Sequence, residues 1–245
     1  MDDAARPGPQ PPDASSEPRP LDDPRALTIL TTEHWGLLTA RSLVYNESFS
    51  RGAMFLTLLS ASLVALGFVA GGSGTTAELP LVAIAILSLD LFVGLATLGR
   101  MVGAGREEMN ALQGMARLRH AYLEIVPGLE PYFVTPRHDD IESVLSAYGS
   151  SASRPTAAQS VLHGITTMPG LIAVINAAVA GGLAAMVAVA LGLGALPALV
   201  IGVAAGVATM ATLAALATRV FEVQGRSLET RFPAAGGDQA GRRNT

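Results

Sequence analysis

Residues 169–218 read PGLIAVINAAVAGGLAAMVAVALGLGALPALVIGVAAGVATMATLAALAT and contain no charged side chain. A helix needs about 20 apolar residues to cross the roughly 30 Å hydrocarbon core of a bilayer, so this run is too long for one crossing. Its middle, residues 191–197, contains two glycines and a proline, which are the residues that interrupt helices. The run therefore predicts two membrane-spanning helices, at residues 169–191 and 197–218, joined by a short turn at 192–196.

The first half of the chain carries a similar pair of apolar segments. Residues 52–70 have no charged side chain, and residues 80–99 contain only one, Asp90. A short connection at 71–79 separates the two. Because buried helices of soluble proteins are rarely apolar on all faces over such lengths, we predict an all-α polytopic membrane protein. Its four transmembrane helices form two hairpins.

The overall composition points in the same direction. Of the 245 residues, 50% are hydrophobic and 15% are charged, whereas an ordinary soluble domain has about 25% charged residues. The chain has no cysteine, which excludes disulfides, thiol nucleophiles and cysteine-based metal sites. A net charge of −4 argues against nucleic acid as a partner.

The distribution of arginine predicts the orientation. The 16 basic residues are all arginines, and none of them lies in the connections at 71–79 and 192–196. The positive-inside rule therefore places residues 1–51, 100–168 and 219–245 in the cytoplasm, with the spans in a bacterial inner membrane. The proline-rich, acidic start, residues 1–25, is predicted to be disordered.

Two cytoplasmic segments, residues 26–51 and 100–168, are predicted to be helical extensions of the spans. Each carries a stripe of mostly apolar residues at intervals of three and four, which strictly alternate in the first stripe. The first stripe consists of Thr31, Trp35, Leu38, Ser42, Tyr45 and Phe49. The second consists of Met109, Leu112, Met115, Leu118, Tyr122 and Ile125. We interpret them as helix faces that pack on one another, with docking of a partner helix as the alternative. Farther along, Asp139 and Glu142 form a start signal for a short helix, and residues 150–154 are predicted to be a loop.

Asp90 is the one charged residue predicted near the bilayer midplane. An ionised carboxylate facing lipid there costs at least about 2.5–3.5 kcal/mol, so this side chain is expected to face other helices. It either forms a structural hydrogen bond or binds a cation or proton in a hydrated cavity. The candidate partners at a similar depth are Ser60, Ser62, Asn176 and Thr209.

The last two predicted spans contain small residues at intervals of four. Such residues allow two helix backbones to approach closely, so we expect these spans to pack through them, with homodimerisation as an alternative. The residues are Ala177 and Gly181 in the third span and Ala198, Gly202 and Gly206 in the fourth.

Motifs for catalysis, cofactors or metals are not apparent. The four histidines, His34, His120, His138 and His163, do not form a two-histidine ligand motif. We find no phosphate-binding loop and no serine hydrolase elbow. The sequence therefore predicts a protein that is not an enzyme and needs no cofactor.

Four stretches resemble uncharacterised small multi-pass membrane proteins of actinobacterial type. They are TTEHWGLL (31–38), YNESFSR (45–51), GMARLRHAY (114–122) and PGLEPYFV (127–134). The resemblance covers roughly residues 28–220 and implies the membrane architecture, with no activity to transfer.

These observations favour a structural or protein-interaction role in the lipid bilayer, with a homo-oligomer or a cytoplasmic protein as the partner. The alternative is a small transporter or channel that uses Asp90 for a cation or proton.

Overall fold

The computed structural model describes residues 20–71, 79–147 and 167–234, in which all regular elements are helical and no strand occurs. The prediction of an all-α fold is therefore confirmed. The long helices are α1 (Ala26–Gly71), α2 (Leu79–Ile125), α5 (Met168–Ala190) and α6 (Ala195–Ser227). The short elements are η1 (Pro20–Asp22), η2 (Pro127–Tyr132) and α3 (Ile141–Ala147). The loop predicted at 150–154 and most of residues 1–25 lie outside the described ranges.

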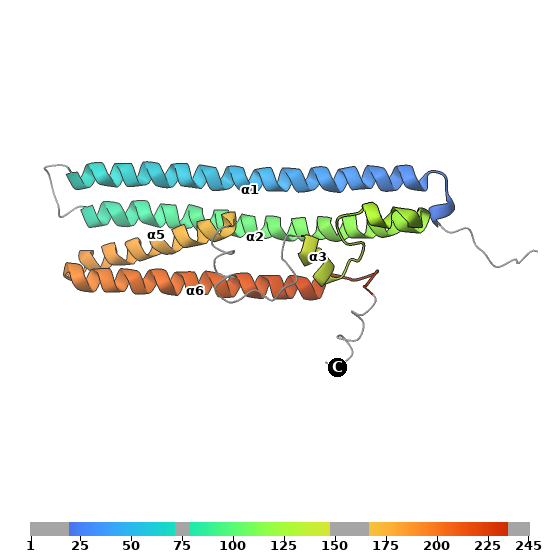
Figure 1. Ribbon diagram of the computed structural model, residues 1–245. Coiled ribbons are helices and arrows are strands. Elements are labelled where there is room, and N and C mark those ends of the chain that lie inside the picture. The colour runs from blue at the N-terminus through green and yellow to red at the C-terminus, as the bar shows by residue number, and fades with distance from the viewer. Residues whose placement is uncertain (1–19, 72–78, 148–166, 235–245) are drawn as a thin grey trace, which may run out of the picture.

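Each of the four long helices is long and apolar enough to cross a membrane. The predicted spans at 52–70, 80–99 and 197–218 fall within α1, α2 and α6, and the span at 169–191 coincides with α5 to within one residue at each end. Figure 1 shows α1 and α2 side by side over the full length of the molecule, whereas α5 and α6 cover mainly one half.

The ends of α5 follow standard capping rules. The hydroxyl of Thr167 accepts a 3.3 Å hydrogen bond from the N–H of Gly170, and the helix begins immediately after this cap. At the other end Gly192 has φ +84°, and the N–H of Leu193 donates to the carbonyl of Ala188 at 3.1 Å. This is a Schellman motif, in which glycine supplies the left-handed residue that ends the helix.

α6 continues beyond the predicted span. Pro197 lies in its first turn, where a missing N–H breaks no intrahelical bond, and the helix runs on to residue 227. Residues 228–234 then turn back and bind to the segment before α3, as described below. Within the predicted tail at 219–245, the backbone N–H groups of Arg231, Phe232 and Ala234 donate to the carboxylates before α3.

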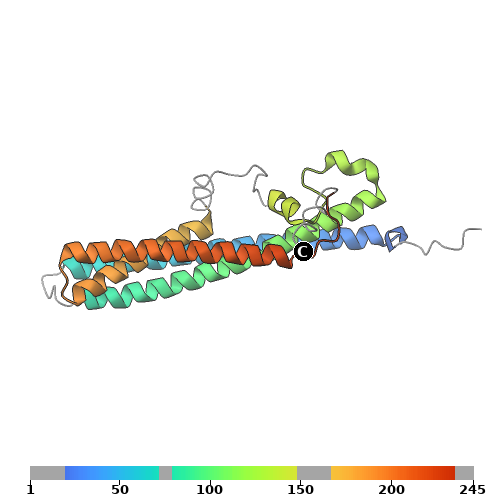
Figure 2. The same cartoon turned by 90° about the horizontal axis from the view of Figure 1, so that it is seen from below.

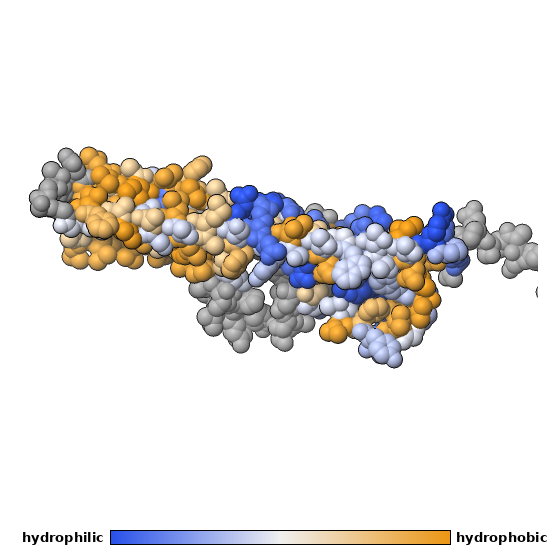
Figure 3. All heavy atoms as spheres, turned by 90° about the horizontal axis from the view of Figure 1, so that it is seen from above, coloured by the Kyte–Doolittle hydropathy of each residue, from blue (hydrophilic) through white to orange (hydrophobic). Residues whose placement is uncertain are grey.

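The molecule has a membrane half and a polar half. Side chains over the membrane spans are mostly hydrophobic, and those at the other end, here called the polar end, are mostly hydrophilic (Figure 3). α2 packs against both α1 and α5, and α5 packs against α6 (Figure 2). Where the two halves meet, a hydrophobic core joins α1, α2 and α5. It consists of Phe55, Met101 and Ile172, one residue from each helix.

Candidate functional site

Asp90 lies in the middle of the spanning part of α2 and is fully buried. The hydroxyl of Ser62 on α1 donates a 2.9 Å hydrogen bond to its Oδ1 atom. Its Oδ2 atom finds no hydrogen-bond partner among the residues that the structure describes. The arrangement is a side-chain hydrogen bond between two helices, as in the structural one of the two alternatives for Asp90.

Asn176 on α5 is also fully buried and faces α2 at Gly94, one turn beyond Asp90. Its Nδ2 atom donates to the carbonyl of Ile172 at 2.9 Å, and its Oδ1 atom has no hydrogen-bond donor within the described part of the chain. A Cβ atom on Gly94 would lie 2.2 Å from this Oδ1 and 2.7 Å from Cζ of Phe55. Because Gly94 has no side chain, the amide of Asn176 can lie directly against the backbone of α2. Gly94 is not among the residues predicted for this site.

Two other candidates are not brought to Asp90. Ser60 is exposed and donates to the carbonyl of Leu56 in its own helix at 2.8 Å. Thr209 is on α6, which packs against α5 rather than against the spanning part of α2. Because adjacent helical residues point about 100° apart, a serine two residues from Ser62 faces elsewhere.

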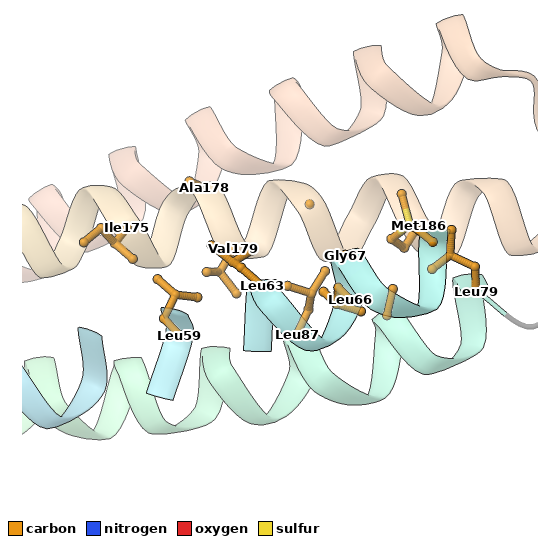
Figure 4. Close-up of a pocket in the computed structure, with 13 residues that line it drawn as sticks. Leu59, Leu63, Leu66, Gly67, Leu79, Leu87, Ile175, Ala178, Val179 and Met186 are labelled. Atoms are coloured by element: carbon orange, nitrogen blue, oxygen red, sulfur yellow. The ribbon is translucent and has the colours of Figure 1, made fainter. Parts of the chain in front are cut away.

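The groove nearest to this cluster is apolar. It has a volume of about 630 Å³ and lies among the outer halves of α1, α2 and α5. Figure 4 shows leucines of α1 and α2 opposite Ile175, Val179 and Met186 of α5. Its lining consists of aliphatic side chains, two glycines and the thioether of Met186, so it suits hydrocarbon and presents no charged or oxygen-bearing side chain to an ion.

The predicted small residues lie between α5 and α6. A Cβ atom on Gly202 would lie 2.8 Å from the carbonyl oxygen of Gly181, and one on Gly206 would lie 3.1 Å from that of Ala177. Ala198 is buried in the same contact region of α6. The small residues of α5 and α6 therefore already pack against one another within one chain.

An ion-pair network joins α1 and α2 where the polar end begins. Arg100 binds Glu47 through two hydrogen bonds of 3.1 and 3.0 Å and also binds Glu107 at 2.9 Å. Arg51 binds Glu47 from one turn away. Hydrogen bonds from Arg100 and then Arg51 lower the pKa of Glu47 to about 2. The pair of Glu47 and Arg51 can be predicted from the sequence, because residues four apart are neighbours on a helix. The pair of Glu47 and Arg100 forms only because α1 and α2 lie side by side.

A second polar cluster holds the C-terminal segment, defined as residues 228–234. The fully buried carboxylate of Asp139 accepts hydrogen bonds from Arg117 at 2.8 Å and from the backbone N–H groups of Arg231 and Phe232. Arg117 also donates to the carbonyl of Glu229. Burial raises the pKa of Asp139, but the hydrogen bonds from Arg117 and the two backbone groups outweigh it and leave that pKa below its ordinary value.

This cluster changes the predicted start of α3. The cap is Asp140, whose Oδ1 atom accepts the N–H of Ser143 at 2.8 Å. The prediction that Asp139 begins the helix is wrong by one residue, because the C-terminal segment binds the Asp139 carboxylate instead. The ring of His120 stacks on Phe232 of that segment at 4.1 Å.

The stripe predicted on α2 packs against α3 and the C-terminal segment. Met109 and Leu112 form a buried core with Val144, flanked by Leu145 and Leu228. Met115 and Leu118 on the same stripe are also buried.

The stripe predicted on α1 is exposed, which corrects the expectation that the two stripes pack together. We call Thr31, Trp35, Leu38, Ser42, Tyr45 and Phe49 the aromatic seam. All six are exposed, with Trp35 and Tyr45 at 64% and 66%. The positions one residue earlier are the half-buried ones, namely Leu30, His34, Leu37, Arg41, Val44 and Ser48.

Specific contacts explain this rotation of α1 by one residue. Arg41 pairs with Glu108 at 2.8 Å, and the hydroxyl of Tyr122 donates to the carbonyl of Leu30. Gly114 leaves room for the side chain of Leu37, because a Cβ atom on Gly114 would lie only 2.9 Å from Cδ1 of Leu37. The Arg41–Glu108 ion pair and the close contact of Leu37 with Gly114 therefore decide which face of α1 packs against α2. The aromatic seam on the neighbouring face is left facing outward.

No cluster of three or more His, Asp or Glu side chains that could hold a metal ion occurs in the described ranges. His34 stacks on Tyr122 at 6.0 Å, and His163 lies outside the described residues. His138 lies beside Asp139, whose carboxylate is taken by backbone N–H groups.

Comparison with protein-family models, curated proteins and solved structures found no match. The resemblance to small multi-pass membrane proteins of actinobacterial type therefore stays a prediction.

Proposed function

We propose that this multi-pass membrane protein is a docking protein, in which four spanning helices hold a rigid helical hairpin on one side of the bilayer. The hairpin presents the aromatic seam to another helix. By the positive-inside rule, the arginine-rich polar end faces the cytoplasm of a bacterial cell and both termini lie there. In this role the chain is not an enzyme.

The observation that carries this proposal is the exposure of the seam, most of which lies beyond the end of the predicted span at residues 52–70. Trp35 is 16 residues before Arg51, which corresponds to about 24 Å along a helix. That distance extends past the headgroup layer when α1 leaves the membrane upright. Phe49, only two residues before Arg51, lies at the height of the headgroups, where aromatic side chains are common. Trp35 and Leu38 are exposed beyond that layer, and exposed apolar side chains in one row are typical of contact surfaces.

The proposal is tested with a photoreactive amino acid placed at position 42 in cells. Ser42 is in the centre of the seam, and Ala40 is an exposed residue on roughly the opposite face of the same helix. The probe at position 42 should form discrete adducts in native membranes, and the probe at position 40 should not. Equal, diffuse labelling at both positions would contradict a docking role.

A second candidate is transport of a cation or proton through Asp90. It is favoured by two buried oxygen atoms without donors, Oδ2 of Asp90 and Oδ1 of Asn176. The apolar lining of the groove among α1, α2 and α5 weighs against transport, because it offers no polar path for an ion. Unchanged ion or proton flux in vesicles containing folded Asp90→Asn protein would exclude transport through this residue.

A further inference from the structure

The aromatic seam has the spacing of a surface that packs against another helix. Its positions alternate intervals of four and three residues from Thr31 to Phe49. This period of 3.5 residues keeps one face of a helix against a second helix over several turns. A helix that lies flat on a membrane has a different geometry, whereas α1 is one continuous helix that rises from the membrane.

The seam and its surroundings are suited to contact with an identical seam. No seam position is charged, and the residues on its outer flank, Thr32, Thr39 and Asn46, are uncharged and exposed. On its inner flank, Arg41 is already paired with Glu108. Two copies can therefore meet face to face without bringing like charges together.

The membrane supplies the alignment that such a contact needs. Two copies inserted with the same orientation have parallel α1 helices, and each seam residue then lies at the same height as its counterpart. This is a two-fold, isologous arrangement. Ser42, the polar residue at the centre of the seam, would meet Ser42 of the second copy, and a single polar position of this kind sets the register of a parallel pair.

The available area is sufficient for a specific contact. Trp35, Tyr45 and Phe49 are exposed in each copy, and six such side chains offer on the order of 1,000 Å². Leu38 and the neighbouring residues add to this area, and specific interfaces bury about 1,200–2,000 Å². The contact would extend the existing α1/α2 packing, because seam and inner face are adjacent on one helix.

We infer that the aromatic seam is the contact between two copies of this chain, which form a parallel helix pair through α1. This inference rests on the proposed docking function and names the partner. Each α2 then lies on the outside of the pair.

The absence of cysteine makes the test direct. Full-length Ser42→Cys and Ala40→Cys proteins are reconstituted into phosphatidylcholine vesicles at high dilution in lipid and treated with a mild oxidant. Ser42→Cys should form a disulfide-linked dimer at least ten times more efficiently than Ala40→Cys. Adding Tyr45→Arg, an exposed substitution that leaves the fold intact, should reduce that dimer to the level of the control.

Four results would overturn the inference. Equal dimer yields for the two cysteine variants would show random collision. Quenching of Trp35, the only tryptophan, by brominated lipid would show that acyl chains cover the seam. A lack of dimers in vesicles, combined with adducts to a different protein from position 42 in cells, would reject self-association and leave the docking function standing. A lack of both would reject both proposals.

Discussion

The hydroxyl of Ser62 and the carboxylate of Asp90 form a 2.9 Å hydrogen bond that links the two helices of the first hairpin within the membrane. The bond places a fully buried acid against an otherwise apolar interface. It occupies one carboxylate oxygen with a neutral donor, which is the chemistry of a structural contact.

The loss of this bond should be measurable as a loss of stability. We expect Ser62→Ala to lower the free energy of unfolding in detergent by about 0.6 kcal/mol, the average for hydrogen bonds between transmembrane helices, and by no more than about 1.7 kcal/mol, the largest such value. Ser60→Ala is the matched control, because Ser60 is exposed and bonded within its own helix. Equal effects of the two substitutions would contradict the assignment.

Gly94 should not tolerate a side chain. In Gly94→Ala, the new Cβ atom would lie 2.2 Å from Oδ1 of Asn176 and 2.7 Å from Cζ of Phe55, so these two buried side chains must move or the helices must shift apart. We expect a loss of about 1–3 kcal/mol in unfolding experiments. Gly99→Ala, five residues later on the same helix, meets nothing within 4 Å and should be neutral or stabilising.

The ion pairs at the start of the polar end should make stability depend on pH. Hydrogen bonds from Arg100 and Arg51 lower the pKa of Glu47 from 4.5 to about 2. A carboxylate whose pKa is lowered by folding stabilises the folded state above its unfolded pKa, and this contribution is lost as the pH falls. The melting temperature should therefore decrease between about pH 4.5 and pH 2.

Glu47→Gln should flatten that part of the profile. The substituted protein should melt lower than the natural one at pH 7 and approach it near pH 2. Thermal unfolding in detergent across this range measures both curves, and parallel curves would show that Glu47 contributes nothing to the pH dependence.

The attachment of the C-terminal segment should depend on Asp139. The backbone N–H groups of Arg231 and Phe232 donate to its carboxylate at 3.0 and 2.7 Å, so their hydrogen exchange should be slow in the natural protein. In Asp139→Ala these two amides should exchange at least tenfold faster. Glu142→Ala, an exposed change three residues away, should leave them protected, and exchange measured by mass spectrometry distinguishes the two cases.

The four spans could be recognised from the chain alone because membrane crossing is a local property. A segment crosses when about 20 consecutive residues are apolar, whatever its neighbours are. The turn at Gly192 follows in the same way, since only a residue that accepts positive φ ends α5 as it does. The small residues of α5 and α6 likewise indicated a close helix contact before any partner was known.

The choice among faces and partners required the assembled molecule. Successive residues of a helix point about 100° apart, so a shift of one position replaces Trp35 by His34 in the contact with α2. That shift is decided by pairs distant in the chain, such as Arg41 with Glu108 and Leu37 with Gly114. The same holds for Asp90, whose bond to Ser62 rather than Ser60 depends on how two helices are rotated against each other.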